Sequence, residues 1–252
     1  MHDLHAILRI AHIAIGAVAL VTFWLPAFTR KGSARHVRFG RWYANTMYAV
    51  AVSAMLLSTL VLIDPLAVRY PDGLPADSDP ARLAAGNRAG GWFLLMLGLL
   101  VFSNVRHGRL VLAVREQRER LRTPAHLALI SSPGLLGLWV ASVGIRYESL
   151  LLMIFSVIAL MGSAGMLWYA FRADIGPRQW MIEHFGSLIG SGIGAYTAFF
   201  AFGGASLFGK VLTGNLMVIP WVLPAIVGTI AIRALTRRYG RRFATPATAS
   251  AS

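Results

Sequence analysis

The chain has 252 residues, of which 56% are hydrophobic and 13% carry a formal charge, and its mean hydropathy is +0.61. Soluble domains carry about 25% charged residues, so this composition favours a membrane protein. There is no cysteine, which excludes disulfides, thiolate catalysis, iron–sulfur clusters and covalently attached c-type haem.

Seven apolar stretches are long enough to cross roughly 30 Å of hydrocarbon as helices. They cover about Ile7–Phe28, Tyr43–Ile63, Gly90–Val111, Pro124–Ile145, Ser149–Phe171, Trp180–Phe202 and Thr213–Leu235. The first begins almost at the N-terminus without a basic leader, which is typical of a retained span rather than a cleaved signal peptide. We therefore expect an all-α fold: a single seven-helix transmembrane domain over residues 1–242, followed by a disordered tail over 243–252.

The basic residues predict how this domain is oriented. Eighteen of the 24 Lys and Arg residues fall in four segments on one side of the predicted bundle, namely 30–41, 106–122, 172–178 and 233–242. Cytoplasmic loops are enriched in Lys and Arg, so the N-terminus is expected outside and the C-terminus in the cytoplasm. The net charge of +14 is then an orientation signal that also attracts anionic lipid at the cytoplasmic face, and a nucleic-acid partner is not expected. Arginine outnumbers lysine 22 to 2, a bias typical of GC-rich bacteria, and the predicted location is a bacterial inner membrane.

Polar residues near the outer end of the first two spans form a predicted outer polar cluster of Arg9, His12 and Asp64. Ionisable residues at membrane depth are costly and often functional. Arg9 either extends its guanidinium to the surface, pairs with Asp64, or helps to bind an anion, a quinone or a proton. The outer loop that follows, residues 64–89, contains four prolines and is expected to be irregular.

Four histidines are predicted on the inner side: His36, His107, His126 and His184. Thr123 is placed to cap the fourth span and Pro124 to occupy its first helical position. His126 and His184 lie near helix N-termini, where the helix dipole favours the neutral imidazole that ligates metals. One hypothesis is thus a b-type haem held by His126 and His184, with His107 and His36 as substitutes. Another is a divalent metal held by His184, His126 and Glu183. The alternative is that each histidine lies singly at the membrane interface, hydrogen-bonded or packed.

The sixth stretch carries a stripe of small residues. Glu183 shares one helical face with Gly186, Gly190 and Gly194. Such faces allow close helix packing, either within the chain or between copies of it in an oligomer. Glu183 on this face and His184 on the adjacent face are expected to form a polar pair at the inner mouth of the bundle. This pair is the more specific hypothesis for a site.

Recognisable catalytic motifs are missing. The chain has no P-loop, no nucleophile elbow, no paired intramembrane carboxylates and no H-x-x-x-H or H-E-x-x-H ligand pair. The leading hypothesis is a non-enzymatic permease for a small molecule or ion, or an accessory membrane subunit. The second is a haem or metal redox protein that exchanges electrons with quinone. The third is a hydrolase with an inner metal and Glu183 as base.

Two segments, RHVRFGRWY at Arg35–Tyr43 and RQWMIEHFGSLIGSGIGAYTAF at Arg178–Phe199, resemble a bacterial family of multi-pass membrane proteins classified as a domain of unknown function. Trp180, Met181, His184 and the Thr197-Ala198-Phe199 ending carry the second match. The resemblance implies a polytopic membrane fold and points to His36, Gly40, Arg41 and His184 as residues to test. It implies no substrate.

Overall fold

The structure, a computed structural model, describes residues 2–173, 175–203 and 219–243, which form helices and their connections with no strand among them. Seven long helices are α1 (His2–Phe28), α2 (Ala34–Ile63), α4 (Pro80–Val114), α5 (Pro124–Arg146), α6 (Leu150–Phe171), α7 (Gln179–Ala198) and α9 (Ile219–Phe243). Three short elements lie between them: the α-helix α3 (Pro65–Arg69), the 3-10 helix η1 (Arg118–Leu121) and the π-helix η2 (Phe199–Gly203). The all-helical prediction is confirmed. The predicted tail at 243–252 and the start of the seventh predicted span lie largely outside the described residues.

Six of these helices are long and apolar enough to cross a membrane: α1, α2, α4, α5, α6 and α9. This supports a membrane protein. The remaining helix, α7, has 20 residues, but Gln179, Glu183, His184 and its four glycines dilute its apolar character. Whether α7 is a seventh span therefore stays a prediction.

Helix boundaries differ from the prediction where capping residues extend a helix beyond its apolar part. Helix α2 begins at Ala34 rather than Tyr43, because the Ser33 side chain accepts a hydrogen bond from the His36 backbone N–H. Helix α4 begins at Pro80 rather than Gly90, with Asp79 as its cap. The loop predicted to be irregular over 64–89 is thus partly helical.

Helix α7 starts within one residue of the predicted start at Trp180. Pro177, a plausible first residue of a helix, precedes a left-handed Arg178, and α7 begins only at Gln179.

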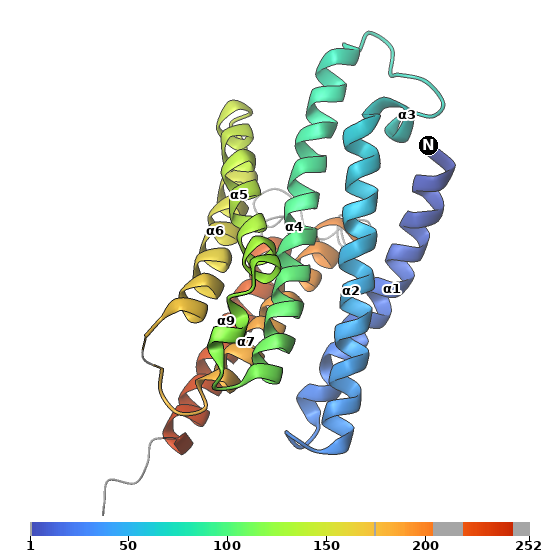
Figure 1. Ribbon diagram of the computed structural model, residues 1–252. Coiled ribbons are helices and arrows are strands. Elements are labelled where there is room, and N and C mark those ends of the chain that lie inside the picture. The colour runs from blue at the N-terminus through green and yellow to red at the C-terminus, as the bar shows by residue number, and fades with distance from the viewer. Residues whose placement is uncertain (1, 174, 204–218, 244–252) are drawn as a thin grey trace, which may run out of the picture.

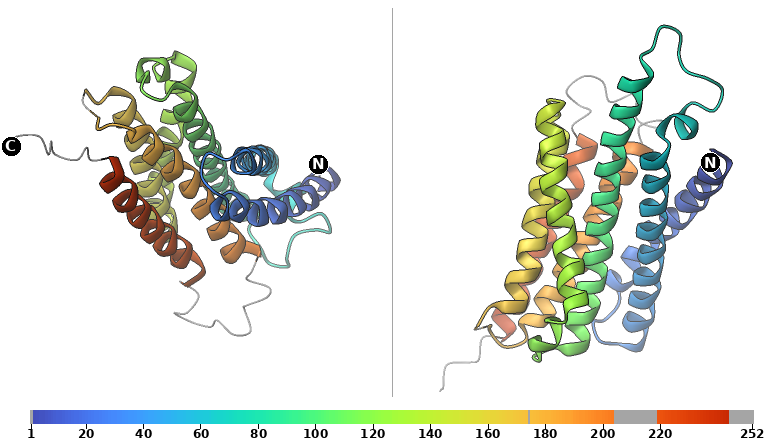
Figure 2. Two further views of the ribbon diagram at one scale, coloured as in Figure 1. Left: turned by 90° about the horizontal axis from the view of Figure 1, so that it is seen from below. Right: turned by 45° about the horizontal axis from the view of Figure 1, so that its top comes forward.

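Helix α4 lies in the middle of the bundle, where it packs against α2, α5 and α7. The α1–α2 pair flanks it on one side and the α5–α6 pair on the other, while α9 packs on α7 (Figures 1 and 2). Helix α7, which carries Glu183 and His184, thus packs against both α4 and α9, and the interior of a bundle is where a membrane protein can place polar groups.

The predicted basic segments gather at one end of the bundle, which we call the basic end. It contains the α1–α2 connection, η1, the α6–α7 connection and the C-terminal end of α9, at the bottom of Figure 1. The opposite end contains the N-terminus, α3 and the α5–α6 connection.

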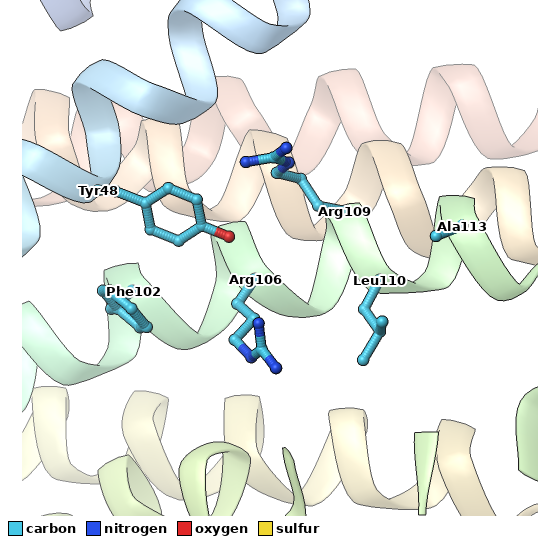
Figure 3. A pocket seen from close by; sticks show the side chains of 6 residues that line it. All are labelled: Tyr48, Phe102, Arg106, Arg109, Leu110 and Ala113. Carbon is cyan, nitrogen blue, oxygen red and sulfur yellow. The ribbon is translucent and has the colours of Figure 1, made fainter. Parts of the chain in front are cut away.

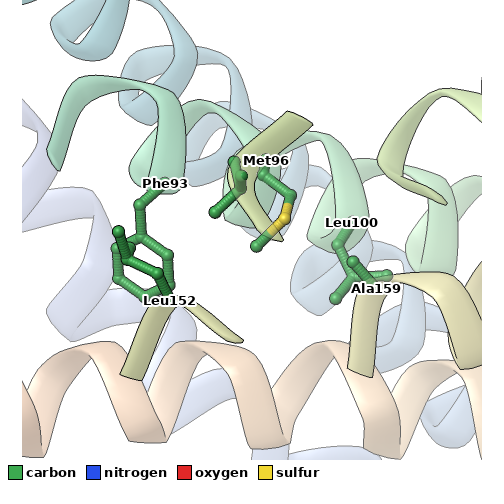
Figure 4. Close-up of a cluster of buried hydrophobic side chains, with 6 residues drawn as sticks. Phe93, Met96, Leu100, Leu152 and Ala159 are labelled. Atoms are coloured by element: carbon green, nitrogen blue, oxygen red, sulfur yellow. The ribbon is translucent and has the colours of Figure 1, made fainter. Parts of the chain in front are cut away.

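The bundle is apolar outside and partly polar inside, the reverse of a soluble protein. Ile7, Leu135, Met161 and Ile230 are each more than 60% exposed, whereas ten Ser, Thr and His side chains of α2 and α4–α7 are buried. The largest buried apolar cluster joins α4, α5 and α6 (Figure 4) through Phe93, Met96, Leu100, Val140, Leu152 and Ala159. Outward apolar surface of this kind is stable only against lipid or another apolar partner.

Candidate functional site

Three side chains from three helices form a hydrogen-bonded chain at the basic end. His107 Nδ1 of α4 lies 3.1 Å from His126 Nε2 of α5, and His107 Nε2 lies 3.1 Å from Glu183 Oε1 of α7. Both histidines are fully buried, while the Glu183 side chain is 24% exposed. We call these three residues the relay chain. It joins three helices through ionisable side chains alone.

Local structure explains why these residues meet. Thr123 accepts a hydrogen bond from the His126 backbone N–H at 3.4 Å and Pro124 starts α5, as the sequence predicted. This holds His126 in the first turn of α5. Glu183 lies in the second turn of α7, and His107 lies two turns before the end of α4. Because α4 ends where α5 and α7 begin, the three side chains come to one level.

The chemistry of the three groups gives the relay chain a direction. An ionised Glu183 accepts only, so the Nε2–H of His107 donates to it. His107 Nδ1 then accepts from the Nε2–H of His126, which leaves the lone pair on His126 Nδ1. That nitrogen is buried and has no hydrogen-bond partner among the described residues. The chain therefore runs from a partly exposed carboxylate to a buried proton acceptor.

Tyr169 of α6 borders the relay chain and was not singled out from the sequence. Its ring meets the His107 ring edge-on, with centroids 5.9 Å apart. It is only 3% exposed, and its hydroxyl is also without a hydrogen-bond partner among the described residues. Buried polar groups without partners are rare in native proteins and often mark function or a bound water. An aromatic residue at a helix end reads from sequence as a membrane-interface anchor, so no sequence signal distinguished it.

The other two inner histidines lie outside the relay chain. His184 Nδ1 donates to the Gly108 carbonyl at 2.8 Å. His36 Nδ1 donates to the Pro26 carbonyl at 3.1 Å and so ties α2 to the end of α1. His36 Nδ1 also lies 3.4 Å from Thr29 Oγ1. Within the described chain, neither histidine is hydrogen-bonded to another histidine, as expected if each lies singly and is hydrogen-bonded or packed.

The four histidines do not fit a metal or haem site. Glu183 and His126 bind opposite nitrogens of His107, so they cannot share one ion with it. The predicted axial pair was His126 with His184. In the structure, His126 instead contacts His107, and His184 contacts a backbone carbonyl. Within the described residues, no group of three or more His, Asp or Glu side chains could hold a metal. The geometry does not support the haem and metal hypotheses, nor a hydrolase that depends on a metal.

The predicted outer polar cluster is divided between two unrelated contacts. His12 Nδ1 lies 2.8 Å from Ser53 Oγ and links α1 to α2. Asp64 instead caps α3, accepting from the Ala67 backbone N–H at 3.1 Å. The Arg9 side chain is exposed and forms no salt bridge with Asp64. The Arg9–Asp64 pairing was wrong because the short helix α3 takes up the Asp64 carboxylate.

The predicted glycine stripe of α7 is used largely within the chain. A Cβ on Gly194 would lie 3.0 Å from Val101 of α4, and one on Gly190 would lie 3.4 Å from Asn104. A Cβ on Gly186 would meet nothing within 4 Å. The most crowded glycine of α7 is Gly192, where an added Cβ would overlap the Phe23 ring of α1. Little of this stripe remains for a second copy of the chain.

Comparisons with protein-family models, with curated proteins and with solved structures found no match. The family resemblance at Arg35–Tyr43 and Arg178–Phe199 therefore stays a prediction.

Proposed function

We propose that this protein is a proton-coupled permease for a small molecule or ion. The observation that carries the proposal is the relay chain, because hydrogen-bonded His and carboxylate groups inside a helix bundle are the usual means of proton transfer across a membrane protein. The proposed setting is a bacterial inner membrane with seven spans, α7 included, and the basic end in the cytoplasm.

Proton transfer along the relay chain is balanced. A proton that binds His126 Nδ1 allows the Nε2 proton of His126 to move to His107 Nδ1. The Nε2 proton of His107 then moves to Glu183, which becomes a neutral carboxylic acid. One proton has entered at the buried end and one has reached the partly exposed end, while both imidazoles stay neutral in the opposite tautomer. Release of the Glu183 proton and return of both tautomers completes the cycle.

The placement of the relay chain supports coupling to a conformational change. Its three residues belong to α4, α5 and α7, so protonation changes the contacts between three helices at once. Protonating both imidazoles would create two neighbouring cations, whose facing nitrogens lie 3.1 Å apart. Neutralising Glu183 would remove its attraction to His107. Either event biases how α7 packs on α4, which is the kind of switch alternating access requires.

The test uses purified protein in liposomes. Uptake of amino acids, carboxylates, sugars and inorganic ions is measured with and without an imposed pH gradient, and the internal pH is followed with a trapped dye. We expect wild-type vesicles to accumulate one class of solute when the gradient is present. Glu183→Gln should abolish accumulation but keep downhill exchange, because an amide cannot take up the proton.

The matched control is His36→Gln, which removes a histidine from the same end without touching the relay chain, and it should transport normally. No solute flux with wild-type protein would overturn the permease proposal. Gradient-driven accumulation that survives Glu183→Gln would overturn the role of the relay chain.

A further inference from the structure

A groove between α2 and α4 has the chemistry of a phospholipid site. It has a volume of about 390 Å³ and is lined by Tyr48, Phe102, Arg106, Arg109, Leu110 and Ala113. Figure 3 shows Tyr48 facing α4 from α2, with both arginines on α4 beside it. The groove lies on a different face of α4 from the relay chain, because His107 is buried while Arg106 and Arg109 are exposed.

The groove combines two cations with an apolar wall. Arg106 and Arg109 are three residues apart on α4, so they share one helix face. Neither forms a salt bridge with a carboxylate in the described part of the chain, and no acidic residue lines the groove. The remaining four lining residues are apolar or aromatic. Two guanidinium groups without a neighbouring carboxylate, placed beside an apolar wall, are complementary to an anion that carries a hydrocarbon chain.

The aromatic residues hold this arrangement in place. The Tyr48 and Phe102 rings, which both line the groove, contact each other with centroids 5.0 Å apart. The Arg109 guanidinium lies 5.7 Å from the centre of the Tyr48 ring, a cation–π distance that orients the positive charge.

The lining residues of α4 lie at successive distances from the end of the helix. At 1.5 Å per residue, Arg109 and Arg106 lie roughly 8 and 12 Å before the end of α4 at Val114, and Phe102 lies roughly 18 Å before it. From there Arg109 extends its guanidinium back along α4 towards Tyr48, whose ring contacts Phe102 (Figure 3). The charge therefore lies directly beside the aromatic wall.

A second groove continues the basic surface on α2. It has a volume of about 570 Å³ and is lined by Gly32, Ala34, Val37, Arg38, Arg41, Trp42 and Asn45. Arg41 and Tyr48 are seven residues apart and thus lie on one face of α2, two turns from each other. The second groove also contains no acidic residue.

We infer that the groove between α2 and α4 binds an anionic phospholipid of the surrounding bilayer, with its phosphodiester on Arg106 and Arg109 and its acyl chain against Tyr48 and Phe102. A zwitterionic lipid is disfavoured because its head-group cation would meet two guanidinium groups. Free phosphate is disfavoured because it leaves the apolar wall uncovered. This inference does not depend on the proposed transport activity.

The test is native mass spectrometry of the detergent-solubilised protein titrated with phosphatidylglycerol or phosphatidylcholine. We expect wild-type protein to prefer phosphatidylglycerol. The double variant Arg106→Gln/Arg109→Gln should bind it about 30-fold more weakly, because each arginine near the surface contributes about 1 kcal/mol and 1.4 kcal/mol is tenfold in affinity.

The matched control removes the same charge elsewhere at the basic end. Arg237→Gln/Arg238→Gln changes two exposed arginines of α9 and should weaken binding less than about threefold. An equal loss in both double variants would overturn the site, because the attraction would then come from net charge. Displacement of the lipid by inorganic phosphate at equal concentration would also overturn it, because the acyl chain would then contribute nothing. Helix content and elution volume of each variant show that it is folded.

Discussion

The two ends of the bundle use similar polar residues in different ways. At the basic end, His107, His126 and Glu183 from three helices bond to one another in the interior. At the opposite end, His12 bonds to a serine and Asp64 caps a helix of five residues. The first arrangement joins segments up to 76 residues apart through ionisable groups alone, whereas the second ends in ordinary structural contacts. In this protein, ionisable side chains therefore pair with one another at the basic end, whereas those at the opposite end contact a serine or the backbone.

Packing along α7 also differs between its two halves. Replacing one glycine in each half by leucine tests this difference. Gly192→Leu should cost more than about 3 kcal/mol of unfolding free energy, because even a Cβ there overlaps the rigid Phe23 ring. Gly186→Leu, closer to the basic end, should cost less than about 1 kcal/mol because the added atoms enter open space. Thermal unfolding in detergent measures both. Equal losses would show that the two positions are packed alike.

Removing one histidine from each end tests whether the relay chain is the more strongly coupled cluster. His107→Ala should cost about 2–3 kcal/mol, because it leaves Glu183 and His126 without their partner in the interior. His12→Ala should cost about 1 kcal/mol or less, since Ser53 keeps its hydrogen bonds to the carbonyls of Ala49 and Val50. Denaturation in a mild detergent–urea series provides the comparison. A larger loss for His12→Ala would reverse it.

The smallest expected effect concerns the outer polar cluster. Asp64→Ala removes the cap of α3 and should cost about 1 kcal/mol, whereas Arg9→Gln should stay within about 0.5 kcal/mol because Arg9 is exposed and unpaired with Asp64. The two changes should also be additive in the double variant. A coupling energy above about 0.5 kcal/mol would show that Arg9 and Asp64 interact after all.

Much of the fold could be predicted from the sequence, because hydrocarbon imposes a simple rule. Helices that face lipid need long apolar runs, and six of the seven predicted runs are helices of spanning length and apolarity. Capping is equally local: Thr123 and Pro124 begin α5 as their residue types require. The starts of α2 and α4 were misplaced because hydropathy detects only the apolar part of a helix, whereas Ser33 and Asp79 extend it into the polar layer.

The sequence placed five candidate residues on the inner side but did not select the three that bond to one another. Spacing brought His107, His126 and Glu183 to the same level of the bundle, since each lies near a helix end at the basic side. Which histidine bonds to which depends on how α4, α5 and α7 rotate and pack about their axes, and many side chains far apart in sequence contribute to that packing. Only the tertiary structure therefore placed His107 between His126 and Glu183 and directed His184 to a backbone carbonyl.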